Sequence, residues 1–308
     1  RGAARGGTEV FERRRGRPRE GDAPMFFVPE SRIEAWIEED LHLMDLTVDA
    51  LGIEDRPGCV ECFPKEDCVI AGVEEAARIF RAVGALAEEV RPSGSRLPAG
   101  TVCLRAEGTA GRLHAVYKAA QNVMEYASGI ATRTAGVVRN ARAASPSVEV
   151  AVTRKHFPGT KHLSVRAALA GGATVHRLGL SESILVFDQH RAFMDEAEFL
   201  SAIPRMAARF PERRIMAEAG SVEEAVRFAE AGVQVIQCER FSPDALRECA
   251  ERVRRIQPGV RISAAGGINA DNAADYAAAG ADVLVTSWVY FGRPQDVKMK
   301  FSAAQARF

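Results

Sequence analysis

The second half of the chain alternates between short apolar runs and longer amphipathic runs, and this pattern restricts the fold more than any other feature. The short runs have four to seven residues and are rich in Val, Ile and Ala, which predicts buried strands. Buried strands that alternate with helices form a parallel sheet with helices on its faces. The expected strands are Val148–Thr153, Thr174–Arg177, Ile184–Asp188, Arg214–Glu218, Val233–Glu239, Val260–Ala265 and Ala281–Thr286. The helical runs between them include Ala192–Phe210, Val222–Ala231, Pro243–Ile256 and Ala270–Ala279.

Two architectures share this pattern, a barrel and an open doubly wound sheet. Open sheets that bind dinucleotides carry a G-x-G-x-x-G turn after the first strand, and the sequence has none there. Polar residues stand at the carboxyl ends of several strands, where barrels place their active sites. We therefore expect an α/β barrel.

The residues before this alternation predict a small α+β domain, because strands and helices mix there without a βα repeat. Ser31-Arg-Ile-Glu34 has the pattern of a capping box and predicts a helix start. Further on, Ser128-Gly129 separates two helical stretches and predicts a break between them. The other expected elements are strands at Gly58–Phe63, Asp67–Val69 and Thr101–Glu107, and helices at Glu74–Val83, Arg112–Met124 and Gly129–Ala143.

The first residues, Arg1–Pro24, are rich in Arg and Gly and hold almost no apolar side chains, so they cannot support a core. We expect them to be disordered, or to lie upstream of a true start at Met25. A basic arm that binds nucleic acid, or a transit peptide, is the less favoured alternative.

Charge and cysteine content exclude several classes of protein. The chain has 41 basic and 41 acidic residues, so no global field attracts nucleic acid or a membrane. It has neither an apolar run long enough to span a bilayer nor an apolar leader. Its six cysteines follow no disulfide-framework spacing, which fits a reducing compartment. We expect a cytoplasmic protein without nucleic-acid or membrane partners.

The segment Val152–Gly179 concentrates positive charge and contains no acidic residue. Its basic side chains are Arg154, Lys155, Lys161, Arg166 and Arg177, with His156, His162 and His176. Such a cluster predicts a ligand with phosphate or carboxylate groups. A run of charge is commonly a solvated face, but several of these charges stand at strand ends, which favours ligand binding.

A glycine pair follows the sixth expected strand, in Arg261-Ile-Ser-Ala-Ala-Gly-Gly-Ile-Asn269. Gly266 and Gly267 allow backbone N–H groups to approach a phosphate at the start of a helix led by Asn269. The next strand ends at Thr286-Ser287, and a phosphate site between the last two strand loops is common in barrels. The alternative is an ordinary tight turn.

Two acidic residues, Glu218 and Glu239, also stand at strand ends. In a barrel they would face the mouth and could hold ribose hydroxyls or a Mg²⁺ ion. The alternative is a salt bridge with Arg240 or Arg214.

Other candidates remain open or weak. His190, after Phe187-Asp188-Gln189, could be catalytic or a structural group at a strand end. Cys59-Val-Glu-Cys62 and Cys68 suggest a metal, but no second ligand pair completes a zinc site, so strand packing is the better account.

Six motifs, in order along the chain, resemble the type II phosphoribosyltransferases, the quinolinate and nicotinate phosphoribosyltransferase group. They are Glu39-Asp40 with Asp45-Leu46-Thr47, Ser128-Gly129-Ile130-Ala131-Thr132, Thr153-Arg154-Lys155 with Pro158-Gly159, His176-Arg177-Leu178-Gly179-Leu180, Phe241-Ser242-Pro243 and Gly266-Gly267-Ile268-Asn269. The resemblance implies an N-terminal α+β sandwich at 25–128, joined by the tail 290–308, and an incomplete TIM-like α/β barrel at 129–289. It also implies a homodimer, or a higher oligomer, in which each barrel mouth is completed by the partner's N-terminal domain.

The resemblance assigns roles to groups of residues. Arg154, Lys155, His176 and Arg177 would hold the acidic substrate and the diphosphate of phosphoribosyl pyrophosphate (PRPP). Glu218 and Glu239 would address the ribose hydroxyls and Mg²⁺. Ala265, Gly266, Gly267 and Ser287 would surround the 5′-phosphate, and Lys118 would reach across the dimer. Lys155, Glu218 and Glu239 are the expected catalytic residues.

Three positions depart from the family pattern. Phe187 stands where quinolinate enzymes have a lysine that helps to bind the dicarboxylate, which puts a decarboxylation step in doubt. Glu239 replaces an aspartate, and Ser287 a glycine. These variants, with Lys118, are most similar to the ModD branch, which is associated with molybdate-transport genes.

We therefore expect a Mg²⁺-dependent phosphoribosyltransferase that acts on a small nitrogen-containing acceptor, acidic or heteroaromatic. One alternative is a non-catalytic protein that binds a phosphorylated metabolite or anion, linked to molybdate transport. Another is a barrel lyase or aldolase with Lys155 as its Schiff-base residue. An interaction protein without a ligand is the least favoured.

Overall fold

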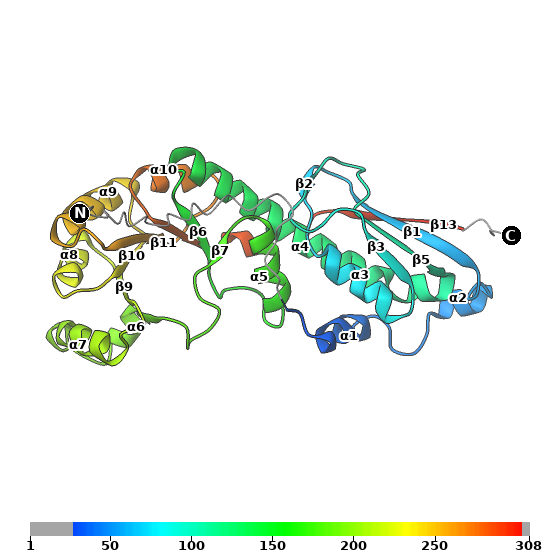
Figure 1. Cartoon of the computed structure of the whole chain (residues 1–308), viewed down its shortest axis with the longest axis horizontal. Coiled ribbons are helices and arrows are strands. Elements are labelled where there is room, and N and C mark those ends of the chain that lie inside the picture. The colour runs from blue at the N-terminus through cyan, green and yellow to red at the C-terminus, as the bar shows by residue number, and fades with distance from the viewer. Residues whose placement is uncertain (1–26, 304–308) are drawn as a thin grey trace, which may run out of the picture.

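The computed structural model of the chain describes residues 27–303. The expectations for Arg1–Pro24 and for a start at Met25 lie outside these residues. The described chain forms two units side by side along its long axis, and the long helix α4 (Ala110–Ala144) runs through both (Figure 1).

The first unit is an antiparallel sheet with helices on one face. Its strand order is β13-β1-β5-β3, and β2 and β4 form a separate two-stranded sheet. Val60 and Cys62 of β1 and Leu104 and Ala106 of β5 alternate with more exposed residues and are fully buried. This alternation is what an antiparallel sheet with one solvated face requires. The strands are β1 (Pro57–Pro64), β2 (Cys68–Val69), β3 (Leu86–Glu89), β4 (Arg96–Leu97), β5 (Leu104–Thr109) and β13 (Val297–Ala303), and the helices α1 (Glu30–Glu38), α2 (Leu46–Leu51) and α3 (Val73–Ala82).

The prediction of a capping box at Ser31 is wrong. Helix α1 begins at Glu30, its N-cap is Pro29, and no side chain within residues 27–303 caps it. Arg78 instead anchors this end of the helix, because its guanidinium donates to Val28 O at 2.8 Å and pairs with the Glu30 carboxylate. A tertiary contact therefore fixes the start of this helix.

The predicted break at Ser128-Gly129 is also absent from the described chain, where α4 is one helix of 35 residues. Both residues lie where other segments pack closely against the helix. The Ser128 hydroxyl accepts a hydrogen bond from Ala71 N at 2.9 Å. A Cβ atom at Gly129 would lie 2.8 Å from Arg293 O, so glycine lets the segment before β13 cross the helix.

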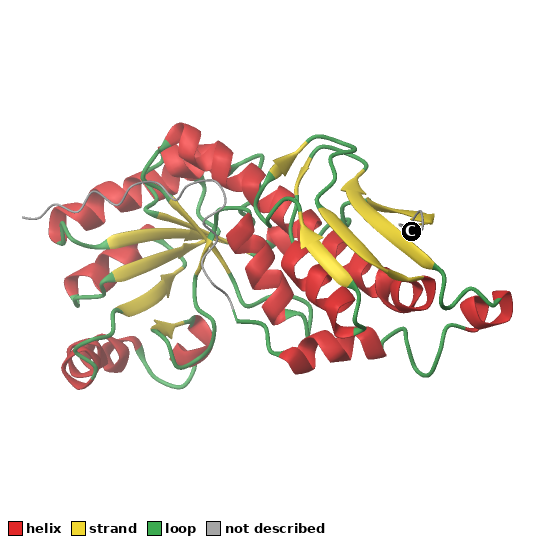
Figure 2. Ribbon diagram, turned by 45° about the vertical axis from the view of Figure 1, so that its right-hand side comes forward, coloured by secondary structure: helices red, strands yellow, loops and turns green. Residues whose placement is uncertain are grey.

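The second unit is a parallel sheet with the order β7-β6-β12-β11-β10-β9-β8. The first strand after α4 is β6, and the last strand of the sheet in sequence is β12. These two strands pair with each other, as in a barrel, while β7 and β8 form the two edges. The barrel is therefore open between β7 and β8, and the expected incomplete α/β barrel is confirmed (Figure 2). All the strands expected here are present, as β6 (Glu149–Val152), β7 (Thr174–Val175), β8 (Ile184–Val186), β9 (Ile215–Ala219), β10 (Val235–Glu239), β11 (Arg261–Ala265) and β12 (Val283–Thr286).

Helices cover the outer face of this sheet. Helix α9 shows why they form where they do, since Ser242 caps Ala245 N and Pro243 occupies the first turn. The predicted helix led by Asn269 is wrong at its start, because α10 begins only at Ala273 and has six residues. The helices are α5 (Lys161–Ala170), α6 (Asp188–Arg191), α7 (Glu196–Arg209), α8 (Val222–Glu230), α9 (Pro243–Ile256) and α10 (Ala273–Ala278), with the 3₁₀ turn η1 (Trp288–Tyr290).

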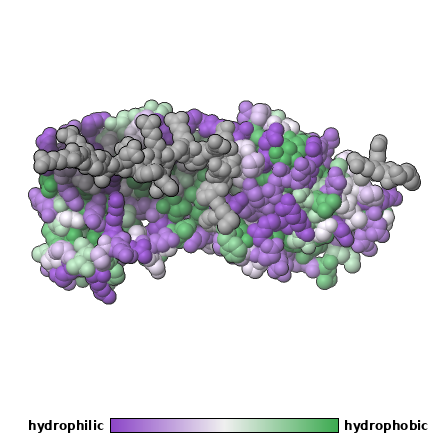
Figure 3. Space-filling view, in the orientation of Figure 1, coloured by the Kyte–Doolittle hydropathy of each residue, from purple (hydrophilic) through white to green (hydrophobic). Residues whose placement is uncertain are grey.

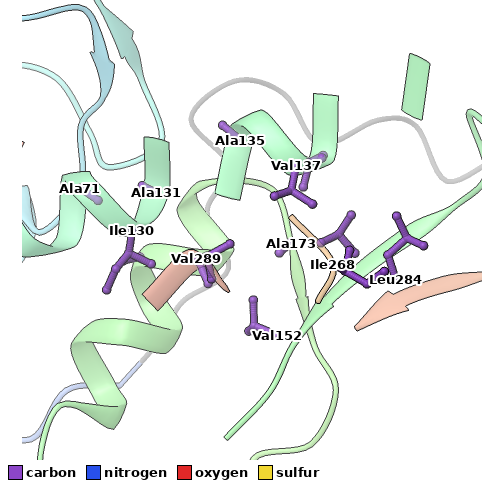
Figure 4. Close-up of a cluster of buried hydrophobic side chains, with 14 of the residues drawn as sticks. Ala71, Ile130, Ala131, Ala135, Val137, Val152, Ala173, Ile268, Leu284 and Val289 are labelled. Atoms are coloured by element: carbon purple, nitrogen blue, oxygen red, sulfur yellow. The ribbon is translucent and has the colours of Figure 1, made fainter. Parts of the chain in front are cut away.

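One hydrophobic core joins the two units. Figure 4 shows Ala71 of the first unit near Ile130 and Ala131 of α4, and Val152 and Leu284 on the barrel strands farther along. These residues belong to one cluster of buried side chains. The long helix therefore holds the barrel in a fixed position against the antiparallel sheet.

The surface mixes polar and apolar side chains, as the face in Figure 3 shows. Among residues 27–303, no helix combines the length and the apolar character that crossing a membrane requires.

Candidate active site

A cavity of about 620 Å³ lies at the carboxyl ends of the parallel strands. This is the edge of the sheet where barrels place their sites, and the volume is in the range of small-molecule pockets. The cavity is lined by Thr153, Arg154, Lys155, His176, Arg177, Phe187, Gln189, Glu218, Gln237, Glu239, Arg240, Ala265, Gly266, Gly267, Ile268, Val285, Thr286, Ser287, Trp288 and Phe291.

The structure brings together all the site residues expected from the sequence except Lys118. Lys118 is exposed on α4, and its Nζ donates to Gln121 Oε1 at 2.7 Å. It does not line the cavity of its own chain.

The basic wall of the cavity comes from the ends of β6 and β7. His176 N donates to Val152 O at 3.1 Å, so the pairing of these strands continues to the basic residues. Arg154 and Lys155 are exposed, whereas Arg177 is only 8% exposed. The cavity therefore has one buried cation and two solvated ones on this side.

His176 is a neutral imidazole in this wall. Burial, together with the positive charges of Arg177 and Arg154, lowers its pKa to about 4. Its Nε2 atom is buried and has no hydrogen-bond partner within residues 27–303. Buried polar atoms are nearly always satisfied, so an unpartnered one in a cavity lining points to a ligand.

The acidic residues Glu218 and Glu239 lie at the carboxyl ends of the neighbouring strands β9 and β10, as the second-to-last and the last residue. Gln237, level with Glu218 in the sheet, donates its Nε2 to Glu218 Oε2 at 2.8 Å. Burial raises the pKa of Glu218, and the negative charges of Glu239 and Asp188 add to this effect. The alternative role, a salt bridge, is weakly supported: Arg240 Nε lies 3.5 Å from Glu239 Oε1, and the Arg240 side chain is 84% exposed.

These carboxylates have the chemistry of a magnesium site. Within residues 27–303 no group of three or more His, Cys, Asp or Glu side chains could hold a metal ion by itself. Mg²⁺ is commonly bound by one or two carboxylates together with substrate phosphates and water, and Glu218 and Glu239 supply such a partial set. A divalent cation here would also relieve the repulsion that raises the pKa of Glu218.

The glycine pair forms the opposite side of the cavity, after β11. Gly266 and Gly267 have positive φ angles of 88° and 80°, a conformation that favours glycine. Asn272 Nδ2 donates to Gly267 O at 3.0 Å, and Thr286 Oγ1 donates to Ile268 O at 2.7 Å. The loops after β11 and β12 are thus tied together, and the loop after β11, not the start of α10, lines the cavity.

Arg240 lines the cavity, a role beyond the salt bridge with Glu239 that the sequence suggests for it. Its φ is 56°, and it is the one non-glycine residue between 27 and 303 with a positive φ. Its N–H donates to Ala265 O at 2.8 Å, and a Cβ at Gly266 would lie 2.5 Å from its Cγ. Strained backbone of this kind is concentrated at functional sites.

Phe187 lies at the open side of the barrel, after β8. The guanidinium of Arg177 stands over its ring, 5.5 Å from the centroid. His190 accepts a hydrogen bond from Phe187 N at its Nδ1, 3.0 Å away, and its ring stacks on the phenyl ring. Of the two roles left open for His190, the structure supports the structural one.

The cysteine motif packs within the first unit. Cys62 and Cys68 are buried, and burial raises the pKa of both thiols. Cys59 Sγ lies 3.0 Å from Ser302 Oγ on the neighbouring strand. These contacts are those of strand packing.

Comparison with known proteins gives matches over most of the chain. The family models described as "Quinolinate phosphoribosyl transferase, N-terminal domain" and "Quinolinate phosphoribosyl transferase, C-terminal domain" match residues 45–128 and 130–300. A protein of Rhodobacter capsulatus named "Putative pyrophosphorylase ModD" is 41% identical over 252 residues, which cover 81% of this chain and 96% of the relative. An Archaeoglobus fulgidus protein named "Probable nicotinate-nucleotide pyrophosphorylase [carboxylating]" is 31% identical over 232 residues, which cover 75% of this chain and 88% of the relative.

Solved structures share the fold. NadC from Streptococcus pyogenes superposes with a TM-score of 0.82 at 24% identity, over 91% of this chain and all of that one. At this level of identity the likeness concerns the fold alone.

Proposed function

Because the chain belongs to the quinolinate phosphoribosyltransferase family, we propose that its barrel mouth transfers ribose 5-phosphate from PRPP to a small nitrogen-containing acceptor. Membership of this family confirms the expected enzyme class, a phosphoribosyl-transferring glycosyltransferase. The observation that carries the assignment to this cavity is the meeting of three kinds of group in it: a glycine loop, two strand-end carboxylates and a basic wall.

Each group meets one part of PRPP in the proposed complex. The 5′-phosphate lies against the backbone of Gly266 and Gly267, beside Ser287. The ribose hydroxyls face Glu218 and Glu239 in the middle of the sheet edge. The diphosphate lies toward Arg154 and Lys155, whose exposed cations can follow a mobile leaving group.

The transfer itself is a substitution at C1 of the ribose. A lone pair of the acceptor nitrogen forms the new bond to C1, while the bond from C1 to the diphosphate oxygen breaks and the diphosphate keeps its electron pair. The protein contributes chiefly by positioning the two reactants and by stabilising the negative charge of the leaving group. Lys155 acts in this second role, as a cation at the rim.

We also propose Mg²⁺ as the cofactor, held by Glu218 and Glu239 through their carboxylates or through water. When bound, it would neutralise part of the diphosphate charge. The pKa of Glu218 is raised by burial and, to a smaller extent, by the negative charges of Glu239 and Asp188, so a cation bound between the carboxylates would be stabilised there.

A homodimer with shared mouths is the assembly that we propose. Lys118 is exposed and lies outside its own chain's cavity, so a role in an active site would place it in the mouth of a partner. Large apolar side chains are exposed in the loops at the mouth and on the segment before α2, which fits two surfaces covered by a second copy. They are Phe157, Leu180, Phe193 and Phe291 at the mouth, Leu43 and Met44 on that segment, and Leu46 at the start of α2.

Titration calorimetry with PRPP and Mg²⁺ tests the proposed function directly. We expect binding in the presence of Mg²⁺ and much weaker binding with EDTA. No binding at millimolar PRPP would contradict the proposal. PRPP binding without release of diphosphate from PRPP in the presence of any acceptor would instead support the non-catalytic alternative.

Mixing two inactive variants tests the shared mouth. A heterodimer of Lys118→Ala and Arg177→Ala has one doubly damaged mouth and one intact mouth. We expect the mixture to regain activity that neither variant has alone. No recovery after subunit exchange would contradict the shared site.

A further inference from the structure

We infer that Arg191 is a positioning residue for Glu218, because from outside the cavity it holds the end of β9 from which this carboxylate reaches the ribose of PRPP. The inference rests on the proposed transfer reaction and adds a residue to it. Arg191 is the last residue of α6, and it is not among the residues that line the cavity.

The end of β9 needs such support because its pairing with the neighbouring edge strand stops early. Strand β8 has only three residues, and its register with β9 ends where Val186 lies opposite Ala217. On its other side β9 continues to pair with β10, with Gln237 opposite Glu218. On the side of β8 the carbonyl oxygen of Glu218 accepts a hydrogen bond from Arg191 Nη2 at 3.3 Å. A side-chain donor therefore continues the support that the edge strand has ceased to give.

The same guanidinium also holds the turn that follows Glu218. Its Nη1 pairs with Oε1 of Glu224 on α8. The other oxygen of this carboxylate, Oε2, accepts a hydrogen bond from Gly220 N at 2.7 Å. Arg191 thus restrains Glu218 O directly and Gly220 N through Glu224. These two restraints lie on either side of Ala219 and fix the backbone that carries the Glu218 side chain.

Burial makes this arrangement rigid. The side chains of Arg191 and Glu224 are 16% and 18% exposed. The guanidinium carbon lies 5.1 Å from the ring centroid of Phe228 and 5.8 Å from that of Phe199, and both phenyl rings are buried. Asp188, at the start of α6, is a further partner of the guanidinium. A planar fork of donors can serve several oxygen atoms at once in a fixed geometry, which a lysine ammonium does not reproduce.

The Glu218 side chain is held at its carboxylate as well. Gln237 Nε2 donates to Glu218 Oε2 at 2.8 Å, so β10 fixes the carboxylate while Arg191 fixes the backbone beneath it. A group that has to meet a ribose hydroxyl gains from such preorganisation, since a misplacement of ~1 Å can reduce the rate by about 100-fold. The contacts of Arg191 therefore bear on PRPP binding although Arg191 itself does not reach the cavity.

A double-mutant cycle on the full chain tests the inference, with the Kd for PRPP measured by calorimetry in the presence of Mg²⁺. Arg191→Met keeps a long side chain and removes the donors, and we expect it to raise this Kd by about tenfold. In a Glu218→Ala background the same change should alter the Kd by less than about twofold, because the carboxylate through which Arg191 acts is gone. A merely structural role would weaken PRPP binding equally in both backgrounds.

Two further variants make the cycle independent of a general loss of stability. Arg191→Lys keeps a cation beside Glu224 but not the fork, so we expect the Kd to rise by between about two- and tenfold. It also replaces Arg191→Met in the cycle if the methionine variant does not fold. Arg227→Met on α8 is the matched control, because its pair with Glu196 is exposed and distant from these contacts in kind; it should leave the Kd unchanged.

The outcomes separate this inference from the proposed function. Failure of the unmodified protein to bind PRPP overturns both. If PRPP binds and Glu218→Ala weakens binding, an unchanged Kd in the Arg191 variants contradicts the positioning role alone. So does an equal loss of affinity with and without the Glu218 carboxylate. Loss in the Glu218 protein together with no loss in the Glu218→Ala background supports the inference.

Discussion

Arg177 and Phe187 meet across the opening of the barrel, with the guanidinium carbon 5.5 Å from the centroid of the phenyl ring. The strands that carry them, β7 and β8, are the two edges of the sheet, so side chains close the rim where backbone hydrogen bonds do not. The contact also orients the buried cation toward the cavity. Its removal should therefore affect substrate binding more than folding.

Arg177→Met is the variant that tests this contact, because it keeps a long side chain and removes the charge. We expect KM for the acceptor to rise by about 10- to 100-fold, since hydrogen bonds to a charged group contribute ~1.5–3 kcal/mol. The thermal unfolding midpoint should change little. Equal acceptor KM in the variant and the unmodified protein would remove Arg177 from the acceptor site.

Glu218→Gln should separate stability from binding. The folded-state pKa of Glu218 lies above its ordinary value, so its charged form destabilises the fold once the pH rises through that pKa. At neutral pH the glutamine variant should therefore be at least as stable as the unmodified protein. Its Mg²⁺-dependent affinity for PRPP should fall by about tenfold or more. Calorimetry and thermal unfolding at pH 7 give both values, and undiminished Mg²⁺-dependent binding would exclude this carboxylate as a ligand.

The acid side of the stability profile should depend on His176. Its pKa falls from the ordinary 6.5 to about 4 on folding, so the unfolded chain takes up a proton first as the pH decreases. The contribution of His176 to stability is complete above pH 6.5 and is lost as the pH falls toward 4. His176→Asn should lack this part of the decline. Denaturant unfolding between pH 4 and 8 measures it, and parallel profiles for the two proteins would be the contrary result.

Gly266→Ala should disrupt the mouth. Both Gly266 and Gly232 have positive φ, so alanine at either position introduces backbone strain of about 1 kcal/mol. Only at Gly266 would the new Cβ also lie 2.5 Å from Arg240 Cγ and 2.8 Å from Glu239 Oε1, whereas at Gly232 no atom lies within 4 Å. We expect Gly266→Ala to lose PRPP affinity and more stability than Gly232→Ala. Equal losses of unfolding free energy in the two variants would contradict the packing of Arg240 on this glycine.

Arg166 joins the two units through a partly buried ion cluster. Its Nε lies 2.8 Å from Glu75 Oε1, and its guanidinium is 3.0 Å from Glu74 Oε2. Arg166→Ala leaves the Glu75 carboxylate buried without its counter-ion, which costs about 3–5 kcal/mol in comparable sites. Arg142→Ala is the matched control, because its pair with Glu149 is exposed and contributes at most about 1 kcal/mol. Similar unfolding free energies for the two variants would show that the cluster does not hold the units together.

The parallel sheet was predictable because its strands are buried on both faces and read as continuous apolar runs. Strands β3 and β4 were not predicted, since they are short and their residues are mostly exposed, as in Leu-Ala-Glu-Glu89 of β3. Their pairing depends on β5 and β2, which local composition does not encode.

The cavity lining was largely predictable from strand-end residues. Gln237 and Arg240 are lining residues that were missed, each for a physical reason. Gln237 precedes Glu239 by two positions on one strand, so alternation alone could have placed it on the same face. Arg240 could not be found in this way, because arginine has no preference for the left-handed backbone conformation that it adopts here. The break predicted at Ser128-Gly129 failed since small residues at a helix crossing resemble those of a loop.

Strand β13 pairs with β1 along its whole length, from Gly58 opposite Ala303 to Pro64 opposite Val297. More than 200 residues separate these partners, and the entire barrel lies between them in the sequence. On a ribosome, β1 therefore emerges long before its neighbour exists, and one side of it stays unpaired until the barrel has been synthesised. The antiparallel sheet can therefore be completed only after the barrel has been translated. A nascent chain stopped before β13 would expose the unpaired backbone N–H and C=O groups of β1, an edge that chaperones could recognise.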